Sequence, residues 1–263
     1  MITVSVVSHG HGSMVVRLAE QLLSLPQVSS IIVTLNIPEE LELPRDRRVH
    51  VIRNAVPQGF GANHNAAFLL CDSPFYCVAN PDIEIVGNPF PSLLQVLQDS
   101  DAAMVAPLVR GAKGQLEDSW RRYPSPLSLG LKIIGLHDGT YPGATLEAIF
   151  EPDWVAGMFL LFTAEDYRAV EGFDESFFLY YEDVDICARL HGRGRKVIGC
   201  SQAVVVHKAQ RASRRDRRHF RYHLISVWQY FVCDWRRIFP AVLRRRARAL
   251  NRIDQGERFG RSG

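Results

Sequence analysis

Hydrophobic and polar positions alternate along the first half of the chain in blocks that are typical of an α/β protein. Short continuous apolar runs predict buried strands at residues 2–7, 31–35, 49–52, 75–79 and 102–106. Apolar residues at helical spacing predict helices after the glycine turn at 10–12, from 62 to 70 and over 93–97. Ser13 is expected to cap the first helix. The alternation predicts an α/β fold with a mostly parallel central sheet and helices on both faces.

The second half of the chain has a less regular pattern. Residues 119–151 contain several prolines and glycines, so we expect a long loop over the active face. Residues 154–162 predict a strand that returns to the core, and Thr163 is placed to begin a helix through Asp166. A helix is expected over 183–191, followed by strands at 197–198 and 203–206.

Composition limits the class of protein. A chain of 263 residues with 47% hydrophobic content buries one sizeable core, with room for an appendage. The five cysteines form no C-x-x-C pair, which indicates small buried residues in a reducing cytoplasm. The first residues lack the pattern of a signal peptide, and no apolar stretch is long enough to span a bilayer. We therefore expect a cytoplasmic protein, soluble or peripheral to a membrane.

The net charge of +3 conceals an uneven distribution of arginine. Arginines are concentrated after residue 208, where the acidic residues are Asp216, Asp234, Asp254 and Glu257. The rest of the chain must then be net acidic. This asymmetry predicts a catalytic domain over residues 1–210 and a basic, helical C-terminal extension over 211–263 that meets an anionic surface.

Two acidic clusters carry the candidate chemistry. Asn80-Pro81-Asp82 follows a buried apolar run, at the edge where α/β sheets bind ligands. Glu182-Asp183 follows an aromatic block at 173–181 that would wall off a site. One cluster suits a divalent cation held against phosphates, and the other suits a general base. Taken alone, the first is equally typical of a turn, and the second of carboxylates favoured by a helix dipole.

Four segments in order resemble a known family. They are N-P-D at 80–82, W-V-A-G at 154–157, G-F-D-E-S-F-F-L-Y-Y-E-D-V-D-I-C-A-R-L at 172–190 and V-V-V-H at 204–207. Together they resemble the family 2 glycosyltransferases of the GT-A fold, most of all rhamnosyltransferase-type enzymes of bacterial cell-surface polysaccharide assembly. The resemblance covers residues 2–207 and implies a Rossmann-like GT-A domain. It also implies inverting transfer from a nucleoside-diphosphate-sugar to a glycan or a lipid-linked acceptor.

The resemblance also implies roles for individual residues. Asp183 would be the catalytic base, and Glu182 would orient the acceptor or Asp183 itself. Asp82 and His207 would hold Mg²⁺ or Mn²⁺. Donor contacts are implied at Ser8, Asn36, Gly59, Gly61, Asn63, Asn80 and Asp82. Acceptor contacts are implied at Trp154, Gly157 and Glu182. The chemistry needs these residue types, because a cation neutralises a departing diphosphate and an in-line attack wants one carboxylate on the opposite side.

Some positions depart from the family or keep a simpler interpretation. The second strand of many members ends in an Asp that reads the nucleobase, whereas Asn36 is the polar candidate here. His9 and His11 either touch the donor or simply form a turn. Likewise, Arg121 and Arg122 either clamp a diphosphate or are exposed loop residues, and His207 by itself suits an ordinary strand end.

The basic extension has three interpretations. Aromatic and aliphatic residues recur there at helical spacing among arginines, at Phe220, Leu224, Val227, Trp228, Phe231 and Trp235. Such a helix packs on the catalytic domain, lies on anionic lipid, or binds nucleic acid. No RNA- or DNA-binding signature accompanies it, so nucleic acid ranks last. We favour peripheral contact with an anionic membrane, at the inner face of the cell membrane.

Two other functional classes stay open. A nucleotidyltransferase would share the α/β fold and the binding of a metal and a nucleotide. However, it is expected to carry a basic glycine-rich loop after the first strand, and residues 8–13 contain no Lys or Arg. A non-catalytic relative would keep the fold and bind a nucleotide-sugar. The presence of Asp82, Glu182, Asp183 and His207 argues against such a binding module, and metal-dependent turnover would separate the two.

Overall fold

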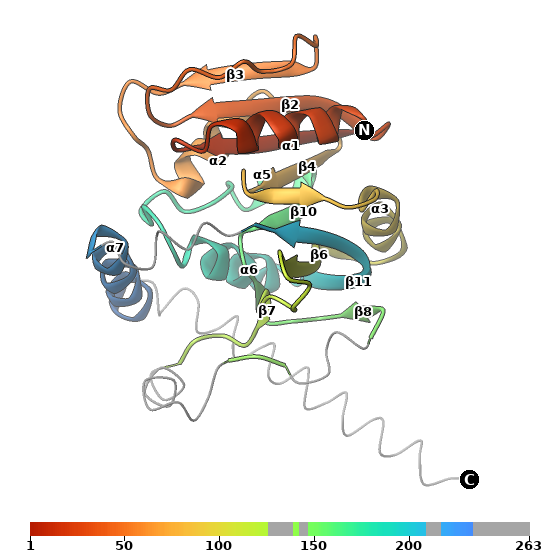
Figure 1. The fold of residues 1–263 in the computed structure, drawn as a ribbon. Coiled ribbons are helices and arrows are strands. Elements are labelled where there is room, and N and C mark those ends of the chain that lie inside the picture. The colour runs from red at the N-terminus through yellow and green to blue at the C-terminus, as the bar shows by residue number, and fades with distance from the viewer. Residues whose placement is uncertain (126–138, 142–146, 209–216, 234–263) are drawn as a thin grey trace, which may run out of the picture.

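The computed structural model describes residues 1–125, 139–141, 147–208 and 217–233. Within these ranges the main sheet has nine strands, and β8 (Ile149–Phe150) joins it by pairing with β11. The order of the other strands is β3 (Val49–Arg53), β2 (Val28–Leu35), β1 (Ile2–Ser8), β4 (Phe75–Ala79), β10 (Phe159–Thr163), β6 (Ala102–Gly111), β11 (Lys196–His207) and β5 (Ile83–Ile85) (Figure 1). A small second sheet pairs β7 (Trp120–Arg121) with β9 (Trp154–Val155).

The central sheet is largely parallel, as predicted. Strands β3, β2, β1 and β4 are parallel neighbours, and β6 is parallel to β11. Strand β10 runs antiparallel between β4 and β6. Because β1, β2 and β4 share one direction, their carboxyl ends meet at the same edge of the sheet, which is where α/β proteins bind ligands.

Helices cover both faces of this sheet. α1 (Ser13–Leu23) and α3 (Phe90–Asp99) pack on one face. α2 (Phe60–Phe68), α5 (Ala164–Ala169) and α6 (Glu182–Gly192) contribute to the core on the other. The alternation in β1 explains the arrangement, because Val4 and Val6 belong to the α1 core whereas Ser5 bonds to His64 of α2, with 2.8 Å between Oγ and Nδ1.

Several local predictions need correction. Residues 154–162 form two strands, β9 and β10, rather than one, because a turn at 156–158 bonds to other elements. The two short strands expected after 196 are the single β11, with a register shift between Cys200 and Val204. Ser13 is the first residue of α1 and does not cap it; Gly12 precedes it. Thr163 does cap α5, with its side chain accepting from the Asp166 amide at 3.1 Å.

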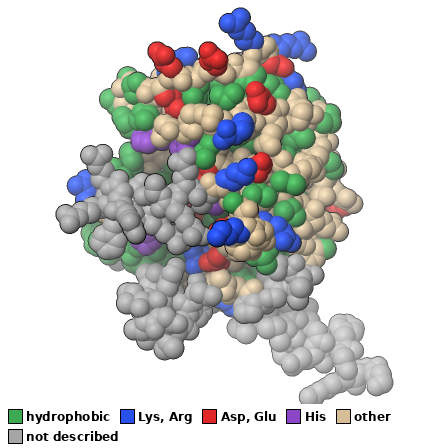
Figure 2. All heavy atoms as spheres, in the orientation of Figure 1, with side chains coloured by type: hydrophobic (Ala, Val, Ile, Leu, Met, Phe, Trp, Pro, Cys, Tyr) green, Lys and Arg blue, Asp and Glu red, His purple; other side chains and the backbone are tan. Residues whose placement is uncertain are grey.

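The described part of the C-terminal extension is helical. α7 (Arg217–Trp228) continues into a π-helical turn, Gln229–Cys233. The predicted domain boundary at 210, Trp235 and the arginines after it lie outside the described residues. None of the helices in the described ranges is long and apolar enough to cross a membrane. On the face in Figure 2, basic and acidic side chains are interspersed over the described surface.

Candidate active site

The edge formed by β1, β2 and β4 gathers the first group of predicted residues. Ser8 ends β1 and is fully buried, and its carbonyl accepts the amide of Asn36 at 2.8 Å. The Ser8 hydroxyl in turn accepts the amide of His11 at 3.3 Å, which shapes the turn between β1 and α1. Asn80 and Asp82 follow the end of β4 at the same edge.

Asp82 and His207 form a pair at this edge. His207 is the last residue of β11 and lies opposite Ile83, so strand pairing brings its ring to Asp82, with 3.1 Å between Nε2 and Oδ2. Their side chains are only 17% and 16% exposed. Burial opposes the charging of His207, but the hydrogen bond and the charge of Asp82, with the charge of Glu117, outweigh it and raise the pKa of His207.

This pair has the donor atoms that a divalent cation would use. Asp82 Oδ1 and His207 Nδ1 are buried without a hydrogen-bond partner in the described part of the chain. Carboxylate oxygen suits Mg²⁺ and Mn²⁺, and imidazole nitrogen is a frequent ligand of transition metals. No cluster of three or more His, Cys, Asp or Glu with metal-binding geometry occurs among the described residues. A cation held by these two residues would need its other ligands from phosphates and water.

The second acidic cluster begins α6. The Asp183 carboxylate accepts two backbone amides, Oδ2 from Gly157 at 3.1 Å and Oδ1 from Val184 at 2.9 Å. Burial raises the pKa of Asp183 to about 6, although these amides and the charge of Arg121 lower it. Burial and the Asp183 charge together raise the pKa of Glu182 well above its usual range. The charge of Asp183 opposes the ionisation of Glu182, so Asp183 is the member of this pair that loses its proton first.

The backbone before α6 is unusual. Tyr180 and Tyr181 both have left-handed conformations, with φ of 71° and 73°, and Tyr181 precedes the first helical residue. Non-glycine residues with such φ values are strained, and strain of this kind clusters at functional sites. The sharp turn places Glu182 and Asp183 in the first turn of α6. The sequence offered no signal for it, since Tyr is not a residue that favours positive φ.

The turn at 156–158 connects the two acidic clusters. Its Gly157 amide donates to Asp183, and its Met158 carbonyl accepts the amide of Asn80 at 2.9 Å. Trp154, two residues before the turn, is 9% exposed, and its indole N–H donates to the Arg122 carbonyl at 2.8 Å. Gly157 thus lies beside the predicted base, whereas the polar atom of Trp154 is bonded to the backbone that follows β7.

Asn36 is held inside a network of amides. Its Oδ1 accepts from Asn54 Nδ2 and from the Gln58 amide, both at 2.8 Å, and its Nδ2 donates to the Gln58 carbonyl at 3.0 Å. Asn63 accepts from Asn54 at 2.6 Å. The network fixes the loop between β3 and α2. Contact of Asn36 with a nucleobase remains a prediction, and Asn54, which completes the network, was not singled out from the sequence.

Gly59 and Gly61 allow α2 to approach the aromatic segment 173–181. A Cβ on Gly59 would lie 2.9 Å from the Phe178 carbonyl oxygen, and one on Gly61 would lie 2.6 Å from the Phe173 Cβ. The Phe60 amide donates to that same Phe178 carbonyl at 2.9 Å. Close packing accounts for both glycines. A direct donor contact at either remains a prediction.

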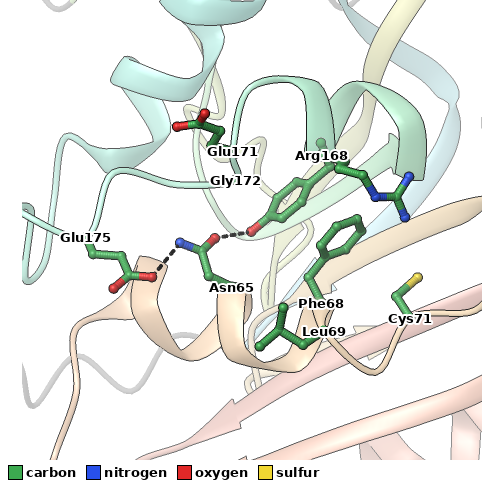
Figure 3. A pocket seen from close by; sticks show the side chains of 9 residues that line it. Asn65, Phe68, Leu69, Cys71, Arg168, Glu171, Gly172 and Glu175 are labelled. Atoms are coloured by element: carbon green, nitrogen blue, oxygen red, sulfur yellow. Dashed lines mark hydrogen bonds between the residues drawn. The ribbon is translucent and has the colours of Figure 1, made fainter.

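Asn65, one turn further along α2, anchors the same segment, 173–181. The sequence had not indicated a role for it. Its Oδ1 accepts from the Phe173 amide and the Tyr167 hydroxyl at 2.9 and 2.7 Å, and its Nδ2 donates to Glu175 (Figure 3). It lines a groove with Phe68, Leu69, Arg168 and Glu171. α5 follows the Thr163 end of β10, which pairs with the start of β4, so this groove lies away from Asp82.

The structure also places Arg121, Arg122 and His11, each of which had two interpretations from the sequence. Arg121 acts electrostatically on Asp183 and forms an ion pair with Asp118 at 3.1 Å, while the Arg122 guanidinium lies 4.3 Å from the Tyr141 ring centre. Burial lowers the pKa of His11 against the opposing charge of Asp82, so His11 lies on the Asp82 side of the site. The β1–α1 turn and Arg121 therefore both belong to the candidate site.

Sequence comparisons agree with this architecture. The family described as glycosyl transferase family 2 matches residues 33–170. Rhamnosyltransferase WbbL of Escherichia coli (strain K12) is 27% identical over 246 residues, covering 88% of this chain and 93% of the relative. The N-acetylglucosaminyl-diphospho-decaprenol L-rhamnosyltransferase of Mycobacterium tuberculosis (strain CDC 1551 / Oshkosh) is 31% identical over 167 residues, which cover 60% of this chain and 54% of that relative.

Solved structures share the fold. GalNAc-T7, crystallised with UDP, GalNAc and Mn²⁺, superposes with a TM-score of 0.60 at 13% identity, covering 79% of this chain and 44% of that one. Staphylococcus aureus TarS (residues 1–349) in complex with UDP superposes with a TM-score of 0.55 at 10% identity, covering 86% and 65%. At these identities the likeness concerns the fold.

Proposed function

The chain belongs to glycosyl transferase family 2, and we propose that it transfers rhamnose or another hexose from a nucleoside-diphosphate-sugar to a glycan or lipid-linked acceptor. Transfer would proceed with inversion, in cell-surface polysaccharide synthesis. The observation that carries this proposal is the position of Asp183, an acid held by two backbone amides with a pKa raised to about 6 by burial. A general base works best when its pKa lies near the working pH.

The proposed reaction is a single displacement. Asp183 accepts the proton of the acceptor hydroxyl, and the oxygen of that hydroxyl attacks the anomeric carbon of the donor sugar. The bond from that carbon to the donor phosphate breaks, and the nucleoside diphosphate leaves with the bonding electrons. The Gly157 and Val184 amides keep the Asp183 carboxylate aligned. Burial and the charge of Asp183 raise the pKa of Glu182, and this neighbouring carboxyl would orient the acceptor.

The donor would lie along the edge that carries Ser8, Asn80 and Asp82. We propose that Asp82 and His207 hold Mg²⁺ or Mn²⁺, since a carboxylate oxygen and an imidazole nitrogen face each other there at 3.1 Å. A divalent cation supplies positive charge to a departing diphosphate. The Asn36 network, with Gly59, Gly61 and Asn63, would shape the wall next to the nucleotide.

The acceptor would enter beside the turn at 156–158, near Trp154, Gly157 and Glu182. One relative is named for an acceptor in which a sugar is joined through a diphosphate to a polyprenol. We propose an acceptor of the same class, which places the protein at the inner face of the cell membrane. Residues 1–210 would form the catalytic domain and 211–263 the basic extension.

The test combines donor binding with turnover. Nucleoside-diphosphate-sugars are screened by thermal shift with and without Mn²⁺, and a ligand at a hundred times its Kd should add ~2.7 kcal/mol to stability. Asp183→Asn should then keep the donor-induced shift but lose transfer by ~10²–10⁴-fold. Glu20→Gln, an exposed carboxyl on α1, is the matched control and should keep full activity.

Three outcomes would contradict the proposal. Equal loss of donor binding and transfer in Asp183→Asn would mean that Asp183 is not the base. A stabilising donor that is never turned over would favour a non-catalytic binding protein. Release of diphosphate from a nucleoside triphosphate, with the nucleotide joined to a sugar phosphate, would favour a nucleotidyltransferase.

A further inference from the structure

α7 is attached to the segment that carries the catalytic acids. Ser226 Oγ donates to the Leu179 carbonyl at 2.8 Å, and the Tyr222 ring stacks on Phe178 with 4.8 Å between centroids. Further contacts join Gln229 to Ser176, His223 to Tyr180 and Tyr181, and Tyr230 to Tyr181. α7 thus contacts most of the residues from 176 to 181, which lead directly into Glu182 and Asp183.

The opposite face of α7, together with the π-helical turn that continues it, is apolar and exposed. Leu224, Trp228 and Val232 recur every four residues, and their side chains are 52%, 60% and 61% exposed. Ile225, next to them, is 49% exposed. The face that contacts segment 176–181 is buried instead, with Ser226 at 2% and Tyr230 at 0%. We call the exposed set of Leu224, Ile225, Trp228 and Val232 the outer ridge; Figure 1 shows α7 at the periphery of the molecule.

The chemistry around the outer ridge favours a lipid surface. Arg221 is exposed on the same helix, and arginines are dense in the sequence on both sides, at 211–218 and 236–248. An apolar helix face bearing Trp, bordered by basic residues, is the pattern of helices that lie in the interface of an anionic bilayer. Such basic residues are attracted to anionic lipid, whereas a second copy of the same basic segment would repel them.

We propose that the outer ridge docks onto an anionic bilayer, and that this contact steadies segment 176–181 and with it Asp183. The proposal rests on the proposed function, since a lipid-linked acceptor would be met at that surface. Tyr180 and Tyr181 are held in strained left-handed conformations, which persist only when neighbouring groups impose them. α7 supplies many of those neighbours. Fixing α7 on lipid therefore stabilises the geometry at the start of α6.

Vesicle binding tests the docking surface. The full chain is sedimented with vesicles of phosphatidylcholine mixed with phosphatidylglycerol, and with vesicles of phosphatidylcholine alone. Preference for the mixed vesicles is expected, and Leu224→Gln combined with Trp228→Gln should weaken that binding about tenfold or more. Leu69→Gln, at a leucine that is 84% exposed at the end of α2, is the matched control and should bind like the wild type.

Hydrogen exchange tests the coupling. On mixed vesicles, amides of both α7 and segment 176–181 should exchange more slowly in the wild type and in Leu69→Gln, and neither should slow in the double variant. Protection of α7 alone would overturn the coupling. A wild type that ignores both vesicle types, or a double variant that merely dissociates a dimer, would overturn the docking surface.

The two proposals fail separately. Vesicle binding and exchange need no donor, so they stand even if no nucleotide-sugar is ever turned over. Conversely, transfer in detergent by a protein that ignores vesicles would leave the proposed function intact and remove only this inference.

Discussion

The Gly157 amide donates to Oδ2 of Asp183 at 3.1 Å, and this bond joins the β9–β10 turn to the start of α6. The next residue of the same turn, Met158, accepts the Asn80 amide at 2.9 Å. Two segments about a hundred residues apart are therefore positioned by one short turn. A shift of that turn would move the proposed base and the proposed donor edge together.

The pH dependence of transfer follows from the burial of Asp183. Burial raises the pKa of this carboxyl to about 6, and a protonated carboxyl cannot accept a proton from the acceptor. Transfer should therefore be low in acid and rise as Asp183 ionises, reaching half of its plateau near pH 6. The measurement is kcat/KM against pH at saturating Mn²⁺. If the rising limb of the pH profile instead lay near the pKa of an ordinary exposed aspartate, the buried environment proposed for Asp183 would be contradicted.

Arg121 should influence the pH at which transfer rises. Its positive charge favours the ionised form of Asp183, so its removal raises the pKa of the base further. Arg121→Gln is expected to move the rising limb of the profile to higher pH while the fold is kept. Arg122→Gln is the control, since Arg122 lies over Tyr141 and should leave the limb in place. If the rising limb of the pH profile is unchanged in Arg121→Gln, the charge of Arg121 does not act on the base.

Glu182 and Asp183 should respond differently to loss of charge. Burial and the neighbouring charge of Asp183 raise the pKa of Glu182 well above its usual range, so Asp183 loses its proton before Glu182 does. Glu182→Gln removes the carboxyl that ionises second and should keep kcat within about tenfold of the wild type, against the ~10²–10⁴-fold loss expected for Asp183→Asn. A Glu182→Gln enzyme as inactive as Asp183→Asn would mean that Glu182 is the ionised base.

The sequence was most informative where chemistry coincides with a regular element. Asn80 and Asp82 were expected at the end of a buried strand, and they follow β4. Glu182 and Asp183 were expected at the start of a helix, and they begin α6. Both predictions rest on hydrophobic periodicity, which is local in the sequence and strong for buried strands and for helices with an apolar face.

Contacts between distant segments were beyond such reasoning. The contact of Asn36 with a nucleobase stays a prediction, and the sequence did not indicate the bonds of its amide to the loop from Asn54 to Gln58, which adjoins it only in the folded state. The turn that divides 154–162 exists because Gly157 and Met158 bond to other elements. Tertiary contacts of this kind override local propensity, and one sequence carries no record of them.

Close packing at Gly61 gives a stability prediction. Replacing a helical glycine with alanine normally stabilises a helix by roughly 0.5–1 kcal/mol. At Gly61, however, the new Cβ would lie 2.6 Å from the Phe173 Cβ, which is too close for any rotamer change to relieve. Gly61→Ala should therefore lower the free energy of unfolding by ~1–3 kcal/mol, the usual cost of overpacking.

Urea denaturation is the measurement for Gly61→Ala, and Gly157→Ala is its control. A Cβ on Gly157 would meet its nearest atom, in Phe60, at 3.4 Å, which is ordinary contact, so that variant should unfold close to the wild-type midpoint. Because Phe173 begins the segment that leads to Asp183, Gly61→Ala should also slow transfer. A Gly61→Ala protein as stable as the wild type would mean that α2 and this segment are less tightly packed than the structure has them.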